Sequence, residues 1–172
     1  MLHLNQVKFT QGSFSLVANF KIQTGAKVAV IGPSGEGKST LLHGIAGFLK
    51  PTRGNIRWAG EPMPNHPGLR PISLLFQDHN LFPHLTVFNN VAIGLNPRLR
   101  LSAPQKKQVS LALQKVGLQD RNESYPSDLS GGQRGRIGLA RVLLRQRPLL
   151  LLDEPFAALG PALKDEMLEA LD

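Results

Sequence analysis

The chain has 172 residues, enough for one globular domain, and its hydrophobic fraction of 41% is ordinary for a protein with a single core. It has no cysteine, which excludes disulfides and thiolate metal sites, and no apolar run long enough to cross a bilayer. The net charge of +8 suggests an acidic partner, but without a lysine and arginine block or a basic stretch interleaved with aromatic residues we expect no nucleic-acid binding. The first residues lack the basic and apolar segments of a secretory signal, so we expect the protein to stay in the cytoplasm unless a partner holds it at a membrane.

The first 77 residues favour strands, with one helix among them. Strand-like apolar residues occupy 2–7 and 14–22, and residues 27–31 predict a short buried strand because β-branched residues dominate it and a glycine ends it. Apolar residues at helical spacing predict a helix over 39–49. The remaining elements expected here are a strand and turn at 54–62, a loop at 62–71 and a buried strand at 72–77.

Helices dominate the middle of the chain. Ser102 followed by Gln105 predicts a capping box, and the helix it starts has an inner face formed by Val109, Ala112, Leu113 and Val116. A second helix is expected over 131–147. A strand at 149–154 and a final helix from about Pro161 complete the chain. We therefore expect one α/β domain over 1–172, with a core formed by 1–77 and 141–172 and an inserted helical subdomain at 78–140.

A glycine-rich stretch between the expected strand 27–31 and the helix after it matches G-x-x-x-x-G-K-[ST], the P-loop. Glycines let backbone N–H groups point at phosphate oxygens, and the following helix directs its positive dipole end at the same anion. Lys38 would reach the β- and γ-phosphates and Ser39 would bind Mg²⁺. A plain turn is the alternative, which the strand–helix context disfavours. The predicted phosphate-binding residues are Gly32, Pro33, Ser34, Gly35, Glu36, Gly37, Lys38, Ser39 and Thr40.

A second candidate site ends the expected strand at 149–154. Asp153 can hold Mg²⁺ through water, and Glu154 can orient and polarise an attacking water as the catalytic base. An acidic strand end without chemistry is the alternative. The presence of a P-loop in the same chain favours the catalytic interpretation.

A third motif, "LSGGQ", resembles the signature sequence of ABC-transporter ATPases. It comprises Leu129, Ser130, Gly131, Gly132 and Gln133. In that family the motif contacts the γ-phosphate of ATP held by the opposite subunit, which implies a head-to-tail dimer of two copies of this chain. A serine-capped helix start is the alternative for this stretch alone. By the same resemblance, Gln77 corresponds to the family's glutamine that touches Mg²⁺ and senses the membrane partner. The fold that the resemblance implies is a P-loop core with an inserted helical subdomain.

Within that family the chain is similar to the ATP-binding subunits of bacterial thiamine importers. The similarity is carried by "GIAGFLKPTRGNI", "RPISLLFQDHNLFPHLTVFNNVAIGLNPRLRLS" and "LLLDEPFAALGPAL". It implies an ATP-hydrolysing motor for uptake of thiamine or thiamine phosphates, at the cytoplasmic face of the bacterial inner membrane. The implied partners are transmembrane permease subunits and, indirectly, a periplasmic substrate-binding protein. Residues 78–91, including Phe82 and His84, are the expected docking face, unless they only pack the helical subdomain.

The chain departs from the family pattern in three places. Gly160 stands where the family has the aspartate of its D-loop, and Gly135 stands where the family often has a glutamine shortly after the signature. The third departure is the ending, so that none of the five histidines matches the family's switch histidine by position. The family also continues beyond the point at which this chain stops, Asp172, so we expect a fragment or a truncated chain. Phe9 is the nearest candidate for stacking on adenine. The alternative functions are a nucleotide-binding module without effective ATPase activity and, less favoured, a soluble ABC protein acting on ribosomes or DNA.

Overall fold

A computed structural model of the chain describes residues 1–77 and 80–155. The chain divides into two compact units, Met1–Ile72 and Ser73–Asp172, and each is described by itself. The expected helix from Pro161 and the glycine at position 160 lie outside the described residues. Within the described ranges, no helix is long and apolar enough to span a membrane.

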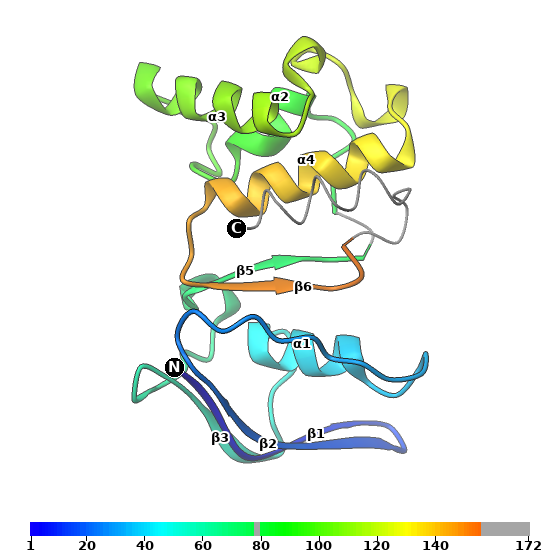
Figure 1. The fold of residues 1–172 in the computed structure, drawn as a ribbon, viewed down its shortest axis with the longest axis vertical. Helices are drawn as coiled ribbons and strands as arrows, with labels where there is room; N and C mark the ends of the chain where they lie inside the picture. Colours follow the sequence, from blue (N-terminus) through cyan, green and yellow to red (C-terminus); the bar gives the residue numbers. More distant parts are fainter. Residues whose placement is uncertain (78–79, 156–172) are drawn as a thin grey trace. The chain divides into compact units, whose positions relative to one another are not determined.

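The first unit contains a four-stranded antiparallel sheet in the order β2-β1-β3-β4 (Figure 1). The strands are β1 (Leu2–Gln11), β2 (Phe14–Ile22), β3 (Arg53–Trp58) and β4 (Glu61–Pro62). The strands expected at 2–7 and 14–22, and the strand and turn at 54–62, are thus confirmed, with β1 running four residues further than expected.

A bulge in β1 sets which of its side chains are buried. The register against β2 shifts between Leu4 and Val7, and Gln6 has a φ of 47° there. A strand alternates its faces with period two, so an extra residue at this point lets the apolar residues on both sides of it face the same way. Four residues of β1 are buried on that basis: Leu2, Leu4, Val7 and Phe9.

Helix α1 (Lys38–Ala46) packs against β1 and β2. Leu41 and Ile45 are buried on its inner face. Helix α1 approaches β1 most closely at Gly44, where a Cβ would overlap the ring of Phe9. The helix expected over 39–49 is confirmed, but it ends at Ala46, since Gly47 takes the left-handed conformation that ends helices.

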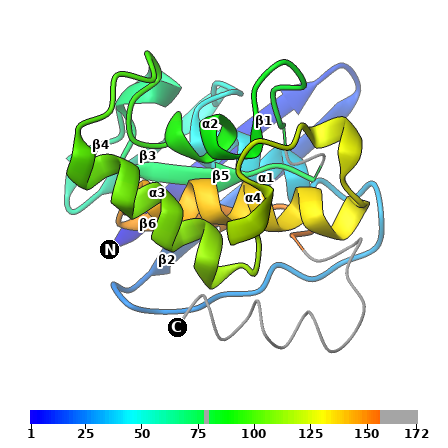
Figure 2. The same cartoon turned by 90° about the horizontal axis from the view of Figure 1, so that it is seen from above.

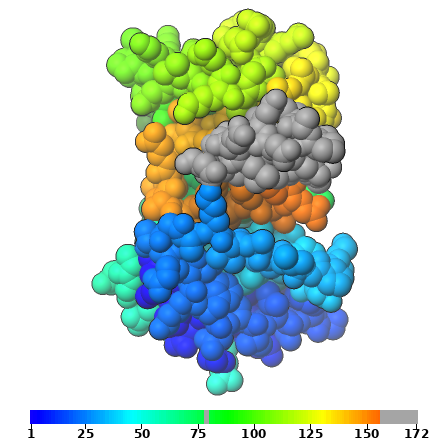
Figure 3. All heavy atoms as spheres, viewed as in Figure 1, coloured from blue at the N-terminus to red at the C-terminus, as the bar shows by residue number. Residues whose placement is uncertain are grey.

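The expected buried strand at residues 27–31 is wrong. These residues belong to neither sheet; the stretch between β2 and α1 that contains them lies among the blue atoms of the first unit in Figure 3. Three of their side chains are exposed: Val28 at 58%, Val30 at 45% and Ile31 at 91%. A strand forms only beside a partner, and β1, β2, β3 and β4 pair among themselves. Local preference for strand structure therefore does not suffice at this position.

The second unit combines a two-stranded sheet with helices. Strands β5 (Ile72–Leu75) and β6 (Leu149–Leu152) pair and run in the same direction (Figure 1). Helices α2 (Val87–Ala92), α3 (Ala103–Lys115) and α4 (Gly131–Leu144) pack against one another (Figure 2). Short 3₁₀ turns lie at Gln119–Arg121 and Pro126–Asp128 in this unit, and another lies at Pro67–Leu69 in the first unit. The mixed α/β fold class is confirmed.

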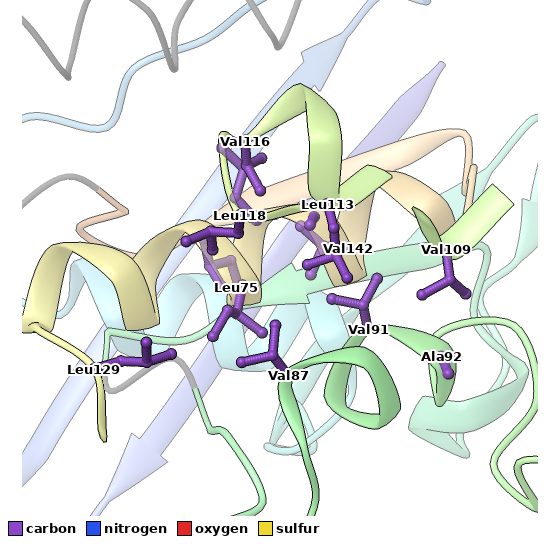
Figure 4. Close-up of a cluster of buried hydrophobic side chains, with 13 residues drawn as sticks. Leu75, Val87, Val91, Ala92, Val109, Leu113, Val116, Leu118, Leu129 and Val142 are labelled. Carbon is purple, nitrogen blue, oxygen red and sulfur yellow. The ribbon is translucent and has the colours of Figure 1, made fainter. Parts of the chain in front are cut away.

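The core of the second unit is an apolar cluster between β5 and the three helices (Figure 4). Leu75 enters it from β5, Val91 from α2, Leu113 from α3 and Val142 from α4. The expected inner face of α3 is confirmed, with Val109, Leu113 and Val116 buried and Ala112 partly buried. The capping box also forms: Ser102 N–H donates to Gln105 Oε1 at 2.9 Å, and Gln105 N–H donates to Ser102 Oγ at 3.4 Å.

Asn90 on α2 holds the loop before that helix in shape. Its Oδ1 accepts from the N–H of Phe82 at 2.8 Å. Its Nδ2 lies 3.0 Å from the carbonyl oxygen of Phe82, 2.9 Å from that of Leu85 and 3.1 Å from that of Thr86. The Asn90 side chain is fully buried, and it supplies the partners of the Phe82 N–H and of the Leu85 carbonyl. The carbonyls of Phe82 and Thr86 also accept from the backbone N–H groups of Leu85 and Asn90, at 3.1 and 2.8 Å.

Asn90→Ala should lower the free energy of unfolding by about 1–3 kcal/mol, because it removes the partners of the part-buried Phe82 N–H and Leu85 carbonyl. Asn89→Ala on the same helix is the matched control, since among the described residues Asn89 bonds through its backbone alone: its N–H donates to Thr86 Oγ1 and its carbonyl accepts from the N–H of Ile93. Urea unfolding of both variants measures the difference. Equal midpoints for the two variants would contradict this account of the loop.

Candidate nucleotide-binding site

The P-loop stretch forms a turn that depends on two glycines. Gly35 has a φ of 85° and Gly37 a φ of 95°, a region that other residues enter only with strain. Gly37 is the N-cap residue of α1, and no side chain caps that helix end. The sequence therefore builds a helix start whose positive dipole end suits an anion.

Lys38 folds back over the start of this loop. Its Nζ donates to the carbonyl oxygens of Gly32 at 2.8 Å and Pro33 at 2.7 Å. An ammonium has three N–H donors, so these bonds fix the charge at the loop while leaving capacity for a further acceptor. Glu36 also folds over the loop, since a Cβ on Gly32 would lie 2.9 Å from Glu36 Oε2.

Two phenylalanines pack near α1. Phe9, the residue expected to stack on adenine, is fully buried under α1 beside Gly44, and its ring has no exposed face in this structure. Phe14, which the sequence reasoning missed, lies instead at the P-loop: a Cβ on Gly37 would be 2.6 Å from its Cζ. The only sequence signal for it was its place at the start of a strand directly after the turn at Gly12.

The acidic site lies in the second unit. Asp153 directly follows β6 and is 5% exposed, and its N–H donates to the carbonyl oxygen of Leu75 on β5 at 2.9 Å. Gln77, two residues beyond the end of β5, donates from Nε2 to Glu154 Oε2 at 3.3 Å. Glu154 has a φ of 47°. The sheet pairing thus brings together two side chains that the sequence placed 77 residues apart.

The donor atoms expected to hold Mg²⁺ fit that ion chemically. The hydroxyl of Ser39, the carboxylate of Asp153 and the amide of Gln77 all offer oxygen, which hard cations prefer. Among the described residues no three His, Asp or Glu side chains gather into a metal site. Mg²⁺ is usually held by one or two carboxylates together with substrate phosphates and water.

The signature stretch forms the start of α4. Ser130 Oγ accepts from the N–H of Gln133 at 3.3 Å, and Gln133 Oε1 accepts from the N–H of Ser130 at 2.9 Å. These two bonds form a capping box. Ser130 therefore caps the helix, which is the structural role that we considered as the alternative to contact with ATP. Because Ser130 uses only a lone pair in that bond, its O–H can still donate to another group.

Ser130→Ala is expected to lower the free energy of unfolding by about 1 kcal/mol through loss of the cap. Ser102→Ala removes the equivalent cap of α3 and serves as the matched control, with a similar stability loss. Only the Ser130 variant should also reduce ATP turnover. An equal turnover for both variants would leave Ser130 with capping alone.

Arginines gather at the C-terminal end of α4 and in the residues directly after it. Burial and the neighbouring Arg145 lower the pKa of Arg141, and burial and Arg147 lower the pKa of Arg145. Arg141 donates to the carbonyl oxygen of Asn80 at 3.0 Å. Arginine starts from so high a pKa that both groups stay protonated at neutral pH.

Comparison with known proteins places this architecture in a family. The family model described as "ABC transporter" matches residues 17–157. A solved dimeric, post-hydrolysis structure of the ATP-binding cassette MJ0796, bound to ADP and Pi, superposes with a TM-score of 0.87 at 30% sequence identity, covering 99% of this chain and 81% of that one. The chain belongs to the ABC transporter family, as an ATPase cassette of mixed α/β fold.

Two relatives with the same name show which members of the family this chain is similar to. The thiamine import ATP-binding protein ThiQ of Cereibacter sphaeroides is 57% identical over 98% of this chain and 73% of its own length. The protein of the same name from Jannaschia sp. is 53% identical over 98% of this chain and 74% of its own length.

Proposed function

We propose that this chain is the ATP-hydrolysing motor subunit of an ABC importer that takes up thiamine. The observation that carries the proposal is the P-loop: an uncapped helix start preceded by two left-handed glycines, with the Lys38 ammonium held at the loop. The assignment of thiamine as the transported substrate rests on the relatives named thiamine import ATP-binding proteins, which are 57% and 53% identical to this chain.

The residues divide the reaction between them. The N-terminal end of α1 and the Lys38 ammonium bind the triphosphate, and backbone N–H groups of residues 32–40 supply further donors. Ser39, Gln77 and Asp153 would hold Mg²⁺, and the ion would supply neutralisation of charge on the phosphates. Glu154 takes the proton of the attacking water, and the hydrogen bond from Gln77 orients its carboxylate. Phe14 offers a ring beside the last P-loop glycine, where it can flank the nucleotide.

One proposed partner completes the ATP site, and the others couple ATP hydrolysis to transport. A second copy would bring Leu129 and residues 130–133 to the γ-phosphate in a head-to-tail dimer, an arrangement supported by the dimeric cassette structures that the chain resembles. Transmembrane permease subunits would dock on residues 78–91, where Phe82 is 44% exposed and meets His84 edge to face at 5.9 Å. The chain would then lie at the cytoplasmic face of the inner membrane, and a periplasmic binding protein would act on it only through the permease.

The experiment is ATP-dependent uptake of radiolabelled thiamine by cells that express the permease subunits of such an importer but lack its ATPase. Expression of this chain should restore uptake, and the Lys38→Ala variant should not. Equal uptake with and without the chain would overturn the proposal. ATP binding without turnover by the purified chain would instead favour a nucleotide-binding module.

A further inference from the structure

Arg70 is a buried cation that the proposed mechanism leaves unused. Its side chain is 4% exposed, and burial lowers the pKa of its guanidinium. Among the described residues no carboxylate pairs with it. Its three hydrogen bonds all go to main-chain carbonyls: Nε to Pro64 at 2.7 Å, and an Nη to Gly44 at 3.0 Å and to Ile45 at 2.5 Å.

Two of those carbonyls belong to the last turn of α1. A helix leaves its last four carbonyls without helical partners. The N–H of Gly47 is shared between the carbonyls of His43 and Gly44, at 3.0 and 3.1 Å. The guanidinium of Arg70 adds a second bond to the Gly44 carbonyl and bonds that of Ile45. A cation at this end also complements the negative end of the helix dipole.

Gly47 makes room for this arrangement. Its φ is 93°, and a Cβ there would lie 2.6 Å from Arg70 Nε and 2.8 Å from Cζ. The position therefore needs glycine for both its backbone conformation and the close approach of the guanidinium. Gly47 and the carbonyls at the C-terminal end of the nine-residue helix α1 thus form a binding site for the Arg70 guanidinium.

The other end of the same helix is the P-loop. Because α1 is one continuous helix of nine residues, fixing its C-terminal end against the Pro64 carbonyl also fixes the direction in which its N-terminal N–H groups point. Arg70 further lies two residues before β5, the strand that leads to Gln77. Building on the proposed function, we infer that Arg70 is a positioning residue that anchors the phosphate-binding helix and thereby sets the affinity for ATP.

The test is ATP binding and steady-state hydrolysis by the purified chain carrying Arg70→Met, which keeps an apolar stem and removes the three donors. We expect the Kd and the KM for ATP to rise about tenfold, since small misplacements of a binding element cost that much or more. The kcat should change less than the KM. Arg57→Met is the matched control: this exposed arginine of β3 donates to the carbonyl of Gly60, its one hydrogen bond within the described residues, and its variant should bind as the unmodified chain does.

A merely structural role gives a different result. It would lower the melting temperature and the folded fraction of Arg70→Met, while the folded molecules kept the original Kd, and that outcome would overturn the inference. Should Arg70→Met fail to fold, Arg70→Lys decides: one ammonium cannot span the three carbonyls, so an intermediate Kd is expected and an unchanged Kd overturns the inference. Failure of the unmodified chain to bind ATP would refute the proposed function itself.

Discussion

Glu154→Gln should reduce steady-state ATP turnover by at least about 10²-fold and leave the Kd for ATP unchanged. A general base contributes about 10²–10⁴-fold, and an amide cannot accept the proton of the attacking water. The substitution is isosteric, and its amide oxygen can still accept from Gln77 Nε2, which lies 3.3 Å from the present carboxylate. Phosphate release and fluorescent-nucleotide binding, measured on the same preparation, separate the two effects.

The control is Glu61→Gln on β4, an exposed glutamate that removes the same charge outside the site. It should turn over at the original rate. A normal rate for Glu154→Gln would place the base on another residue. A raised Kd would instead give Glu154 a part in binding rather than in proton transfer.

Features that depend on local sequence were predictable. Both capping boxes follow from a serine and a glutamine three residues apart, and both form as the pattern indicates. The left-handed residues Gly35 and Gly37 fall inside the matched P-loop. In each case the interacting groups lie within a few residues, so the chain has little choice of partner.

Features that depend on distant partners were not predictable from local pattern. Residues 27–31 have strand-like composition, but strand formation requires a neighbour that pattern alone does not supply. Phe9 and Phe14 are both aromatic residues near the first turn, and only the packing of α1 decides that Phe9 is buried and Phe14 lies at Gly37. Arg70 reaches carbonyls 25 and 26 residues away, a contact with no sequence signature.

Lys38→Ala should weaken ATP binding by at least about 30-fold and remove measurable turnover with it. Hydrogen bonds to charged groups contribute about 1.5–3 kcal/mol each, and the ammonium is the one full positive charge that the P-loop motif directs at the β- and γ-phosphates. The uncapped start of α1 remains in the variant, so residual weak binding is expected. Equilibrium binding of a fluorescent ATP analogue measures the loss.

Lys38→Ala should change the free energy of unfolding only slightly, so a loss of ATP binding can be attributed to the missing ammonium. Lys38 bonds the carbonyls of Gly32 and Pro33, and the bond to Pro33 is exposed, so water replaces the ammonium there. Lys50→Ala, beyond the other end of α1 and exposed, removes the same charge from the same unit. If both variants bind alike, net charge alone draws the nucleotide to this unit. If only Lys38→Ala fails, the geometry of the loop is what holds the triphosphate, because the two chains then differ only in where the charge was lost.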